Sequence, residues 1–285
     1  MTIGDLINEY ENELNEAGIS DARFEILEII AHVLNKTPSS LRLCMDKNVD
    51  RSFIDPLIIR LKNYEPWQYI VGKAYFFNEE YEVGKGVLIP RPDTELLVEK
   101  AFETVVSTGK TDPIIWDLCT GTGCVGISLG NYLKREGYDP KLVLVDKFDE
   151  ALEYTRKNLS QALDKKAFTI VKADVLEGFD DIPGNPDVII SNPPYINSDD
   201  MKILDRFVKD NEPSTALFGV SDDGLLFYRK FASRSQVLNE GGSIIVEHGY
   251  DQAESVRDIF EKEGLKHPQS FKDYGGNFRV TLAYK

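Results

Sequence analysis

Two different hydrophobic patterns divide the chain. Up to about residue 64, apolar residues recur at helical spacing, and no strand-like alternation interrupts them. Gly18 with the pair Ser20-Asp21, and later Thr37-Pro38-Ser39, break and restart this pattern as a helix end and helix caps do. The sequence therefore predicts a small helical bundle over residues 1–72.

A different pattern begins after Gly72. Residues 74–83 place two aromatic runs around a polar turn, which is typical of a β-hairpin. We interpret residues 73–90 as a hairpin linker and place the domain boundary there.

Beyond Pro92, short apolar strands alternate with amphipathic helices. The expected strands are 114–118, 142–145, 168–171, 188–190, 243–246 and 278–284, and the expected helices lie near 94–107, 124–135, 149–163, 223–238 and 251–263. This alternation is typical of a doubly wound α/β sheet, which binds ligands at the carboxyl ends of its strands. The sequence predicts such a domain over residues 91–285.

Composition narrows the classes of protein. A chain of 285 residues with 42% hydrophobic content supports two packed domains. The formal charge of -15 disfavours a protein that binds by neutralising nucleic-acid phosphates. The three cysteines form no CxxC pair and the three histidines form no cluster, so we expect no metal and reduced thiols in the cytoplasm. We also expect no membrane association, because no apolar run approaches the length of a membrane span.

The tetrapeptide Asn192-Pro193-Pro194-Tyr195 directly follows the apolar run Val188-Ile189-Ile190. An Asn side-chain oxygen and a main-chain carbonyl fixed by prolines form two acceptors suited to one NH2 group. We therefore expect an amine or amide nitrogen as the substrate atom. The alternative is an ordinary turn at the end of a strand, because Asn-Pro and Pro-Pro are common in loops.

The expected cofactor half follows the first three strands. A turn with two glycines leads into a helix after the first strand. Acidic residues lie at the ends of the first, second and third strands: Asp117, Asp146 and Asp174. Acid at three strand ends suits a cationic, nucleoside-bearing cofactor such as S-adenosylmethionine, with Asp146 placed to bind a ribose diol. The alternatives are a structural glycine turn and ordinary helix-capping aspartates. The predicted cofactor-binding residues are Asp117, Cys119, Thr120, Gly121, Thr122, Gly123, Asp146, Lys147, Asp174, Val175 and Asn192.

With these motifs in register, the chain resembles the class I S-adenosylmethionine-dependent methyltransferases. It is most similar to the HemK or PrmC type, which methylates a glutamine of peptide-chain release factors at N5. The resemblance covers essentially the full length and includes residues 65–72, 89–95, 211–213, 247–249 and 275–280. One departure is Cys119, where the family's turn usually carries glycine; we interpret it as a small buried hydrophobe.

The resemblance implies a Rossmann-like domain with a seven-stranded, mostly parallel sheet, preceded by an N-terminal domain (1–72) that recognises the substrate. It implies transfer of the methyl group of S-adenosylmethionine to the glutamine of the Gly-Gly-Gln motif in class I release factors. S-Adenosylhomocysteine is the other product, and translation termination is the process modulated. Asn192 and the Pro193 carbonyl are expected to accept the two amide protons while Tyr195 packs against the amide and Pro194 contacts the substrate.

The roles of three further residues stay open. We expect Arg91 and Glu95 to bind the substrate and to close the site over substrate and cofactor, because the resemblance places this segment at the rim of the active site. The alternative is a structural ion pair and a first-turn helix acid. We expect His248 to be a hydrogen-bonded supporting residue and not an acid–base catalyst.

Three other functions remain to be distinguished. An adenine-N6 methyltransferase presents the same NH2 geometry but normally needs a basic surface, which the acidic charge disfavours. A methyltransferase for a ribosomal-protein glutamine is harder to separate by motifs. A catalytically silent S-adenosylmethionine-binding partner is disfavoured by the intact tetrapeptide at 192–195.

Overall fold

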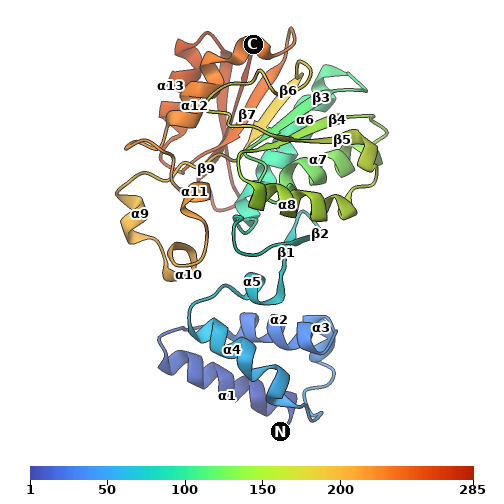
Figure 1. The fold of residues 1–285 in the computed structure, drawn as a ribbon, viewed down its shortest axis with the longest axis vertical. Coiled ribbons are helices and arrows are strands. Elements are labelled where there is room, and N and C mark those ends of the chain that lie inside the picture. The colour runs from blue at the N-terminus through green and yellow to red at the C-terminus, as the bar shows by residue number, and fades with distance from the viewer. The chain divides into compact units, whose positions relative to one another are not determined.

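A computed structural model describes all residues 1–285, which form two compact units (Figure 1). The first, the helical unit, comprises Met1–Lys73 together with Asp205–Asn211. The second, the sheet unit, comprises Ala74–Leu204 together with Glu212–Lys285. The predicted limits of 1–72, 73–90 and 91–285 leave residues 205–211 in the last domain, whereas their contacts group them with the helical unit.

The helical unit is an all-helical bundle, as the pattern of its first residues predicts. Thr2 and Thr37 cap their helices with side-chain oxygens, and Ser40 completes a capping box with Thr37. The apolar stripe of the first helix is buried in the core of the unit. The helices are α1 (Ile3–Glu16), α2 (Arg23–Val33), α3 (Pro38–Leu41), α4 (Asp55–Lys62), α5 (Trp67–Val71) and, from much later in the chain, α10 (Arg206–Lys209), with a 3-10 turn η1 (Arg51–Phe53).

Residues 205–211 join the helical unit at Tyr64. The Arg206 guanidinium lies 3.8 Å from the centroid of the Tyr64 ring, and Asn211 Nδ2 donates to the Tyr64 carbonyl at 2.7 Å. Phe207 also contacts this ring, at 5.3 Å between centroids. One tyrosine therefore holds a segment that is distant in sequence.

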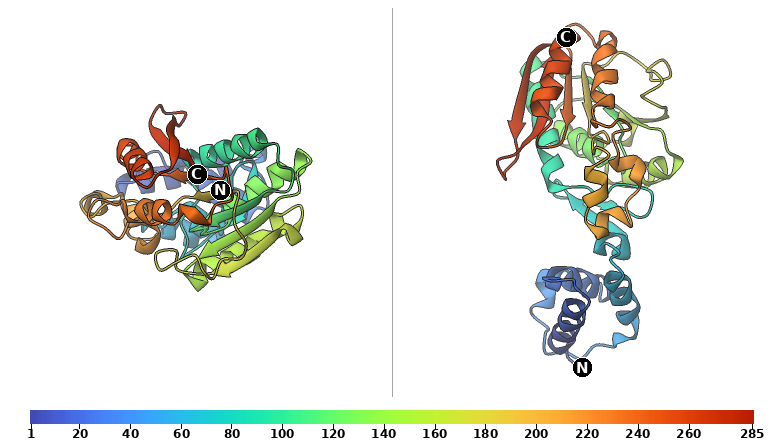
Figure 2. Two further views of the ribbon diagram at one scale, coloured as in Figure 1. Left: turned by 90° about the horizontal axis from the view of Figure 1, so that it is seen from above. Right: turned by 90° about the vertical axis from the view of Figure 1, so that its left-hand side faces the viewer.

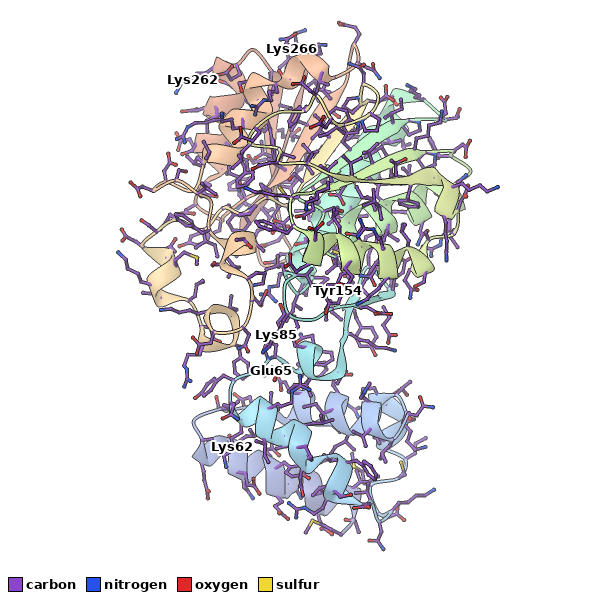
Figure 3. All side chains as sticks on the ribbon, in the orientation of Figure 1. Lys62, Glu65, Lys85, Tyr154, Lys262 and Lys266 are labelled. Carbon is purple, nitrogen blue, oxygen red and sulfur yellow. The ribbon has the colours of Figure 1, made fainter.

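The predicted hairpin is present as β1 (Lys73–Phe76) and β2 (Glu79–Glu82). Phe77 and Asn78 have φ of 49° and 62°, as a two-residue hairpin turn with positive φ at both positions requires. After the hairpin the chain lies directly on α8 (Asp149–Asn158), where a Cβ at Gly84 would overlap the Tyr154 hydroxyl. Figure 3 labels Tyr154 and the neighbouring Lys85 at this place.

The sheet unit contains a seven-stranded sheet in the order β5-β4-β3-β6-β7-β9-β8. Its first five strands in the chain pair in parallel, and β9 is antiparallel to both of its neighbours. The chain leaves β3 in one direction to form β4 and β5 and then returns to form β6 on the other side of β3, which creates a topological switch point. The strands are β3 (Ile114–Leu118), β4 (Lys141–Asp146), β5 (Phe168–Lys172), β6 (Val188–Ser191), β7 (Ser243–Glu247), β8 (Lys266–Lys272) and β9 (Phe278–Tyr284).

Helices cover both faces of this sheet (Figure 2). Ile115 of β3 packs into the cluster with α6 (Glu95–Thr108) and α7 (Cys124–Arg135), and the next residue, Trp116, packs into the cluster on the other face. That second cluster includes α12 (Leu226–Ser233) and α13 (Ala253–Lys262). Burial on both faces explains why the central strands are continuously apolar.

The predicted α/β fold with a mostly parallel seven-stranded sheet is confirmed, with differences in detail. The strand β8 is absent from the sequence prediction, because it is a polar edge strand with a register shift and little apolar alternation. The helix expected over 223–238 is divided into α12 and a 3-10 turn η5 (Ser235–Val237), and the one over 149–163 ends at Asn158. Between β6 and α12 lie three short helices, of which α9 (Asp200–Ile203) and α11 (Ser214–Leu217) belong to the sheet unit.

None of the helices has the length and apolar character needed to cross a lipid bilayer.

The close packing of α7 on the sheet gives a first prediction. A Cβ at Gly126 would overlap Leu144 Cδ2 and lie 2.8 Å from Asp117 Oδ2, both inside the core. We expect Gly126→Ala to destabilise the sheet unit by about 1–3 kcal/mol in urea unfolding, because overpacking outweighs the gain in helix propensity. Gly130→Ala on the same helix is the matched control: its Cβ meets the tip of the half-buried Phe168 ring at 2.6 Å, which can shift. Equal losses in the two variants would contradict this account.

Candidate functional site

A cavity of about 540 Å³ opens at the carboxyl ends of the strands beside the switch point. It is lined by the turn after β3, the ends of β4 and β6, the linker residues 86–91, and parts of the segment between β6 and α12. Twelve of the predicted site residues line it: Arg91, Asp117, Cys119, Thr120, Gly121, Thr122, Asp146, Lys147, Asp174, Val175, Asn192 and Pro194. The predicted residues Glu95, Gly123, Pro193 and Tyr195 are not part of its lining.

The turn between β3 and α7 has three residues in the left-handed region. Gly121 and Gly123 have φ of 56° and 83°, which glycine adopts without steric cost. Gly123 also precedes the first residue of α7, and a Cβ there would lie 3.0 Å from Ile127 and 3.2 Å from Thr155. The glycines therefore allow the tight turn that places Gly121 N against Asp146 and leads directly into α7.

Cys119 is the third residue with positive φ, at 58°. A side chain in this conformation costs about 1–2 kcal/mol, so the cysteine is strained where glycine would not be. Burial, and then the neighbouring Asp146 carboxylate, raise the pKa of the thiol well above its ordinary value. The thiol stays protonated, which agrees with a packing role and not a chemical one.

Two of the acidic residues are buried and bound to backbone N–H groups. Asp117 Oδ2 accepts from Gly126 N at 3.0 Å and from the Thr120 hydroxyl at 2.5 Å. Asp146 accepts from Gly121 N at 2.9 Å through Oδ2 and from Phe148 N at 3.1 Å through Oδ1. Burial raises the pKa of both carboxyls, that of Asp117 to about 7.

The third acidic residue is in an ion pair. Asp174 Oδ2 lies 2.7 Å from Lys147 Nζ, and Oδ1 accepts from Leu176 N at 3.0 Å. Partial burial alone would raise the pKa of Asp174, but these two hydrogen bonds hold it below its ordinary value. The carboxylate is therefore ionised and positioned beside the cavity.

Asn192 is held in one orientation by a residue that the sequence analysis did not consider. Its Nδ2 donates to the hydroxyl oxygen of Thr94 at 3.2 Å, and Thr94 is buried at the end of η2 (Pro92–Thr94). This leaves Asn192 Oδ1 free to accept a hydrogen bond at the cavity. No sequence signal predicts the contact, because the two residues are 98 positions apart.

Tyr195 is fixed at both ends behind the lining of the cavity. Its hydroxyl donates to Glu247 Oε1 at 3.3 Å, and its carbonyl accepts from Gln252 Nε2 at 3.0 Å. Gly224 lies so close to this carbonyl that a Cβ there would overlap it. Tyr195 therefore supports the turn, and its predicted packing against a substrate amide remains a prediction.

The two candidate rim residues have separate environments. Arg91 lines the cavity and forms an ion pair with Glu212, a buried residue whose other oxygen accepts from Ile89 N at 3.2 Å. Glu95 instead accepts from Phe77 N in the hairpin turn at 2.8 Å. Its placement favours the structural alternative, and the partner of Arg91 is Glu212.

His248 is fully buried, and both ring nitrogens have partners. Nδ1 lies 2.8 Å from the Gly249 carbonyl and Nε2 lies 2.8 Å from the Thr281 hydroxyl. Burial lowers its pKa to about 4, so the ring is neutral at physiological pH. These contacts fit a supporting role, which remains a prediction. No group of His, Cys, Asp and Glu side chains is arranged to hold a metal ion.

Two family models match this chain. Residues 5–72 match a family model described as the PrmC N-terminal domain, and residues 92–216 match one described as the methyltransferase small domain. The fold and the second match define the class: an S-adenosylmethionine-dependent methyltransferase.

The nearer relatives give the family. A release factor glutamine methyltransferase of Clostridium acetobutylicum is 36% identical over 85% of this chain and 82% of its own length. One of Clostridium botulinum is 34% identical over 100% of both chains. The chain belongs to the release factor glutamine methyltransferase family.

Among solved structures, the hMettl16 catalytic domain in complex with the MAT2A 3'UTR hairpin 6 is similar, with a TM-score of 0.53. The sequences are 17% identical, and the match covers 72% of this chain and 75% of that one. The likeness is one of fold.

The burial of Asp117 predicts a pH dependence of stability. Its pKa is raised from 3.8 to about 7, so between these values the folded state binds more protons than the unfolded state. The free energy of unfolding contributed by Asp117 is therefore full below the unfolded pKa and decreases as pH rises to about 7. We expect the free energy of unfolding of wild type, measured relative to that of Asp117→Asn, to decrease as pH rises over that range.

The measurement is urea unfolding followed by Trp116 fluorescence in a Trp67→Phe background. Trp116 is fully buried in the sheet unit, and Trp67 belongs to the helical unit. If the stabilities of the two proteins change in parallel across the range, Asp117 is ionised in both the folded and the unfolded state.

Proposed function

We propose that the chain transfers the methyl group of S-adenosylmethionine to the side-chain amide nitrogen of the glutamine in the Gly-Gly-Gln motif of class I release factors. The observation that carries this is the Asn192 amide. Thr94 binds its NH2 group, so its oxygen is presented to the cavity, next to a half of the cavity lined by carboxylates. An acceptor in that position suits a substrate NH2 group.

The charges of the cavity suit the proposed cofactor. Each basic side chain of the lining is paired, Lys147 with Asp174 and Arg91 with Glu212, while Asp117 and Asp146 have no cationic partner. Such a lining favours a cation over a phosphorylated cofactor. When bound, S-adenosylmethionine supplies a methyl group on a positively charged sulfur.

Asp146 and the turn after β3 are the proposed binding groups for the nucleoside part. Each Asp146 oxygen accepts one backbone hydrogen bond and keeps a lone pair, which a ribose hydroxyl satisfies. Residues 119–123 supply close backbone approach, and Asp174 with Lys147 and Val175 forms the adjoining wall.

The substrate nitrogen needs activation by position. An amide nitrogen is a poor nucleophile because its lone pair is delocalised into the carbonyl. Asn192 Oδ1 and the Pro193 carbonyl accept its two protons and hold the lone pair toward the methyl group, with hydrogen bonds that strengthen as the nitrogen becomes pyramidal. Pro193 and Pro194 restrict the backbone, so these acceptors are fixed before the substrate binds. After methyl transfer the nitrogen is positively charged and acidic, so it loses one N–H proton to water.

We further propose that the helical unit recognises the release factor. This unit contains the predicted recognition domain of residues 1–72. It exposes large apolar side chains that its own core does not use, including Leu43 at 86% and Phe53 at 68% exposed. Exposed apolar groups of this size suit a protein partner.

The test of the reaction is mass spectrometry of a class I release factor incubated with the protein and S-adenosylmethionine. We expect one added methyl group on the Gly-Gly-Gln glutamine, and turnover reduced by about a hundredfold or more in Asn192→Ala, because the oriented acceptor is lost. Cofactor affinity, measured by calorimetry, should be nearly unchanged. Asn185→Ala is the matched control, since Asn185 precedes the same strand β6 at its other end and bonds only to the Val237 and Asn239 region.

Two results would contradict the proposal. A label that appears in a ribosomal protein or in nucleic acid, and not in the release factor, would keep the fold and the cofactor but replace the substrate. Full turnover in Asn192→Ala would remove the tetrapeptide from the reaction centre.

The recognition role predicts that substitutions on the helical unit affect methylation of the intact release factor but not of a short peptide. For Leu43→Ser combined with Phe53→Ser, we expect the KM for intact release factor to rise about tenfold, because apolar interface contacts are lost. Methylation of a short peptide containing Gly-Gly-Gln should be unchanged. Leu163→Ser, an exposed leucine of the sheet unit, serves as the control. If the peptide and the intact protein are affected equally, the helical unit acts on the site and not on recognition.

A further inference from the structure

A buried carboxyl group stands directly behind the tetrapeptide. Glu247 ends β7 and is 2% exposed, and its Oε1 accepts from the Tyr195 hydroxyl at 3.3 Å. The other oxygen, Oε2, has no hydrogen-bond partner, and the nearby Thr94 hydroxyl acts to lower the pKa of the carboxyl group. A buried carboxylate without full hydrogen bonding is costly to keep, so its position calls for an explanation.

Thr94 connects this carboxyl group to Asn192. Its hydroxyl has a single proton and accepts a hydrogen bond from Asn192 Nδ2 at 3.2 Å. When Glu247 is ionised, its negative charge favours an orientation in which the hydroxyl proton is directed toward the carboxylate. The Thr94 oxygen then acts only as an acceptor toward Asn192, which must present its NH2 group to Thr94 and its oxygen to the cavity.

We infer that Glu247 is a positioning residue, which acts through Thr94 to fix the Asn192 amide with its oxygen toward the substrate and through Tyr195 to hold the turn in place. The inference rests on the proposed function, because it names what orients the acceptor of that reaction. Glu247 does not itself line the cavity, whereas Thr94 does.

Protonation of Glu247 removes this control. The neutral acid donates its own proton to Thr94, so the Thr94 proton is free to bond to the oxygen of a flipped Asn192 amide. A flipped amide presents NH2 to the substrate NH2, and one hydrogen bond to the reacting group is lost. Methyl transfer should therefore depend on ionised Glu247.

The surroundings place this titration near neutrality. Burial raises the pKa of Glu247 to about 7, while Thr94, the charge of Arg279 and the Tyr195 hydroxyl act in the opposite direction and Asp93 adds to the increase. His248 titrates far below this range because its pKa is lowered to about 4. The titratable and charged groups that face Glu247 are Asp93, Cys124 on α7, Tyr195, Tyr228 on α12 and Arg279 on β9. The Tyr228 hydroxyl donates to the Glu247 carbonyl, and Arg279 pairs with Asp93 and Asp273.

The first experiment compares kcat for release factor methylation in wild type and Glu247→Gln across pH 7. Gln keeps the size of the side chain and donates as the protonated acid does. We expect the ratio of wild-type to variant kcat to rise from about one at acid pH to about ten at alkaline pH, with KM unchanged, as the loss of one hydrogen bond predicts. The ratio isolates Glu247 from Asp117, which titrates in the same range in both proteins.

Thr94 provides the second arm. Thr94→Val removes the hydroxyl and should give the same flat, reduced kcat as Glu247→Gln, and Thr94→Ser should recover most of the rate that Thr94→Val loses. A ratio of one at every pH, or a Thr94→Val variant with the wild-type pH profile, would overturn the inference.

A third readout does not depend on turnover. In wild type, the Asn192 side-chain NH2 resonances in NMR spectra, assigned by their absence in Asn192→Ala, should shift with pH near 7, and the shift should vanish in Glu247→Gln. If release factor is not methylated but the resonances titrate, the proposed function fails and the positioning role stands. If release factor is methylated and the resonances do not titrate, the positioning role fails alone.

Discussion

The parallel pairing of β3 with β4 on one side and β6 on the other is the constraint on which the site depends. It aligns Leu118 with Val145 and with Ser191, so the residues that follow these positions meet at one edge of the sheet. The glycine turn, Asp146 and Asn192 are brought together by this register, and the hydrogen bond from Gly121 N to Asp146 then ties the turn to the end of β4. Because the switch point lies between β3 and β6, the chain leaves a space there that connecting loops do not cross, and the cavity occupies it.

Around that framework, a small number of buried polar contacts decide how the side chains point. Thr94 binds the NH2 group of Asn192, Gln252 binds the Tyr195 carbonyl, and Arg91 pairs with Glu212. Each contact joins segments that are far apart in the chain, so the entry to α6, the loop after β6 and the ends of β7 and α13 must all be in place together. The orientation of one amide thus depends on the complete fold of the sheet unit.

This explains what the sequence could and could not predict. Periodicity and local turn chemistry predicted α7, β3 and the hairpin turn because their determinants lie within a few residues. The polar strand β8 gave no such signal, and neither did the contact of residues 205–211 with Tyr64. Glu95 was grouped with Arg91 because they are neighbours in sequence, yet a helical turn separates their environments and Glu95 bonds to the hairpin. Thr94 and Gln252 were missed because hydrogen bonds across 98 and 57 positions leave no periodic trace.

The features that lower stability gather at the same place. Cys119 occupies a left-handed conformation, and Asp117 and Glu247 are carboxyl groups whose burial raises their pKa to about 7. The two apolar clusters on the faces of the sheet offset these costs, because their burial removes a large apolar surface from water. Burial has a second effect, because a dipole or charge acts more strongly where water is excluded. The same desolvation that makes Asp117 and Glu247 costly therefore strengthens the hydrogen bonds of Asp117 to the turn after β3 and of Glu247 to Tyr195.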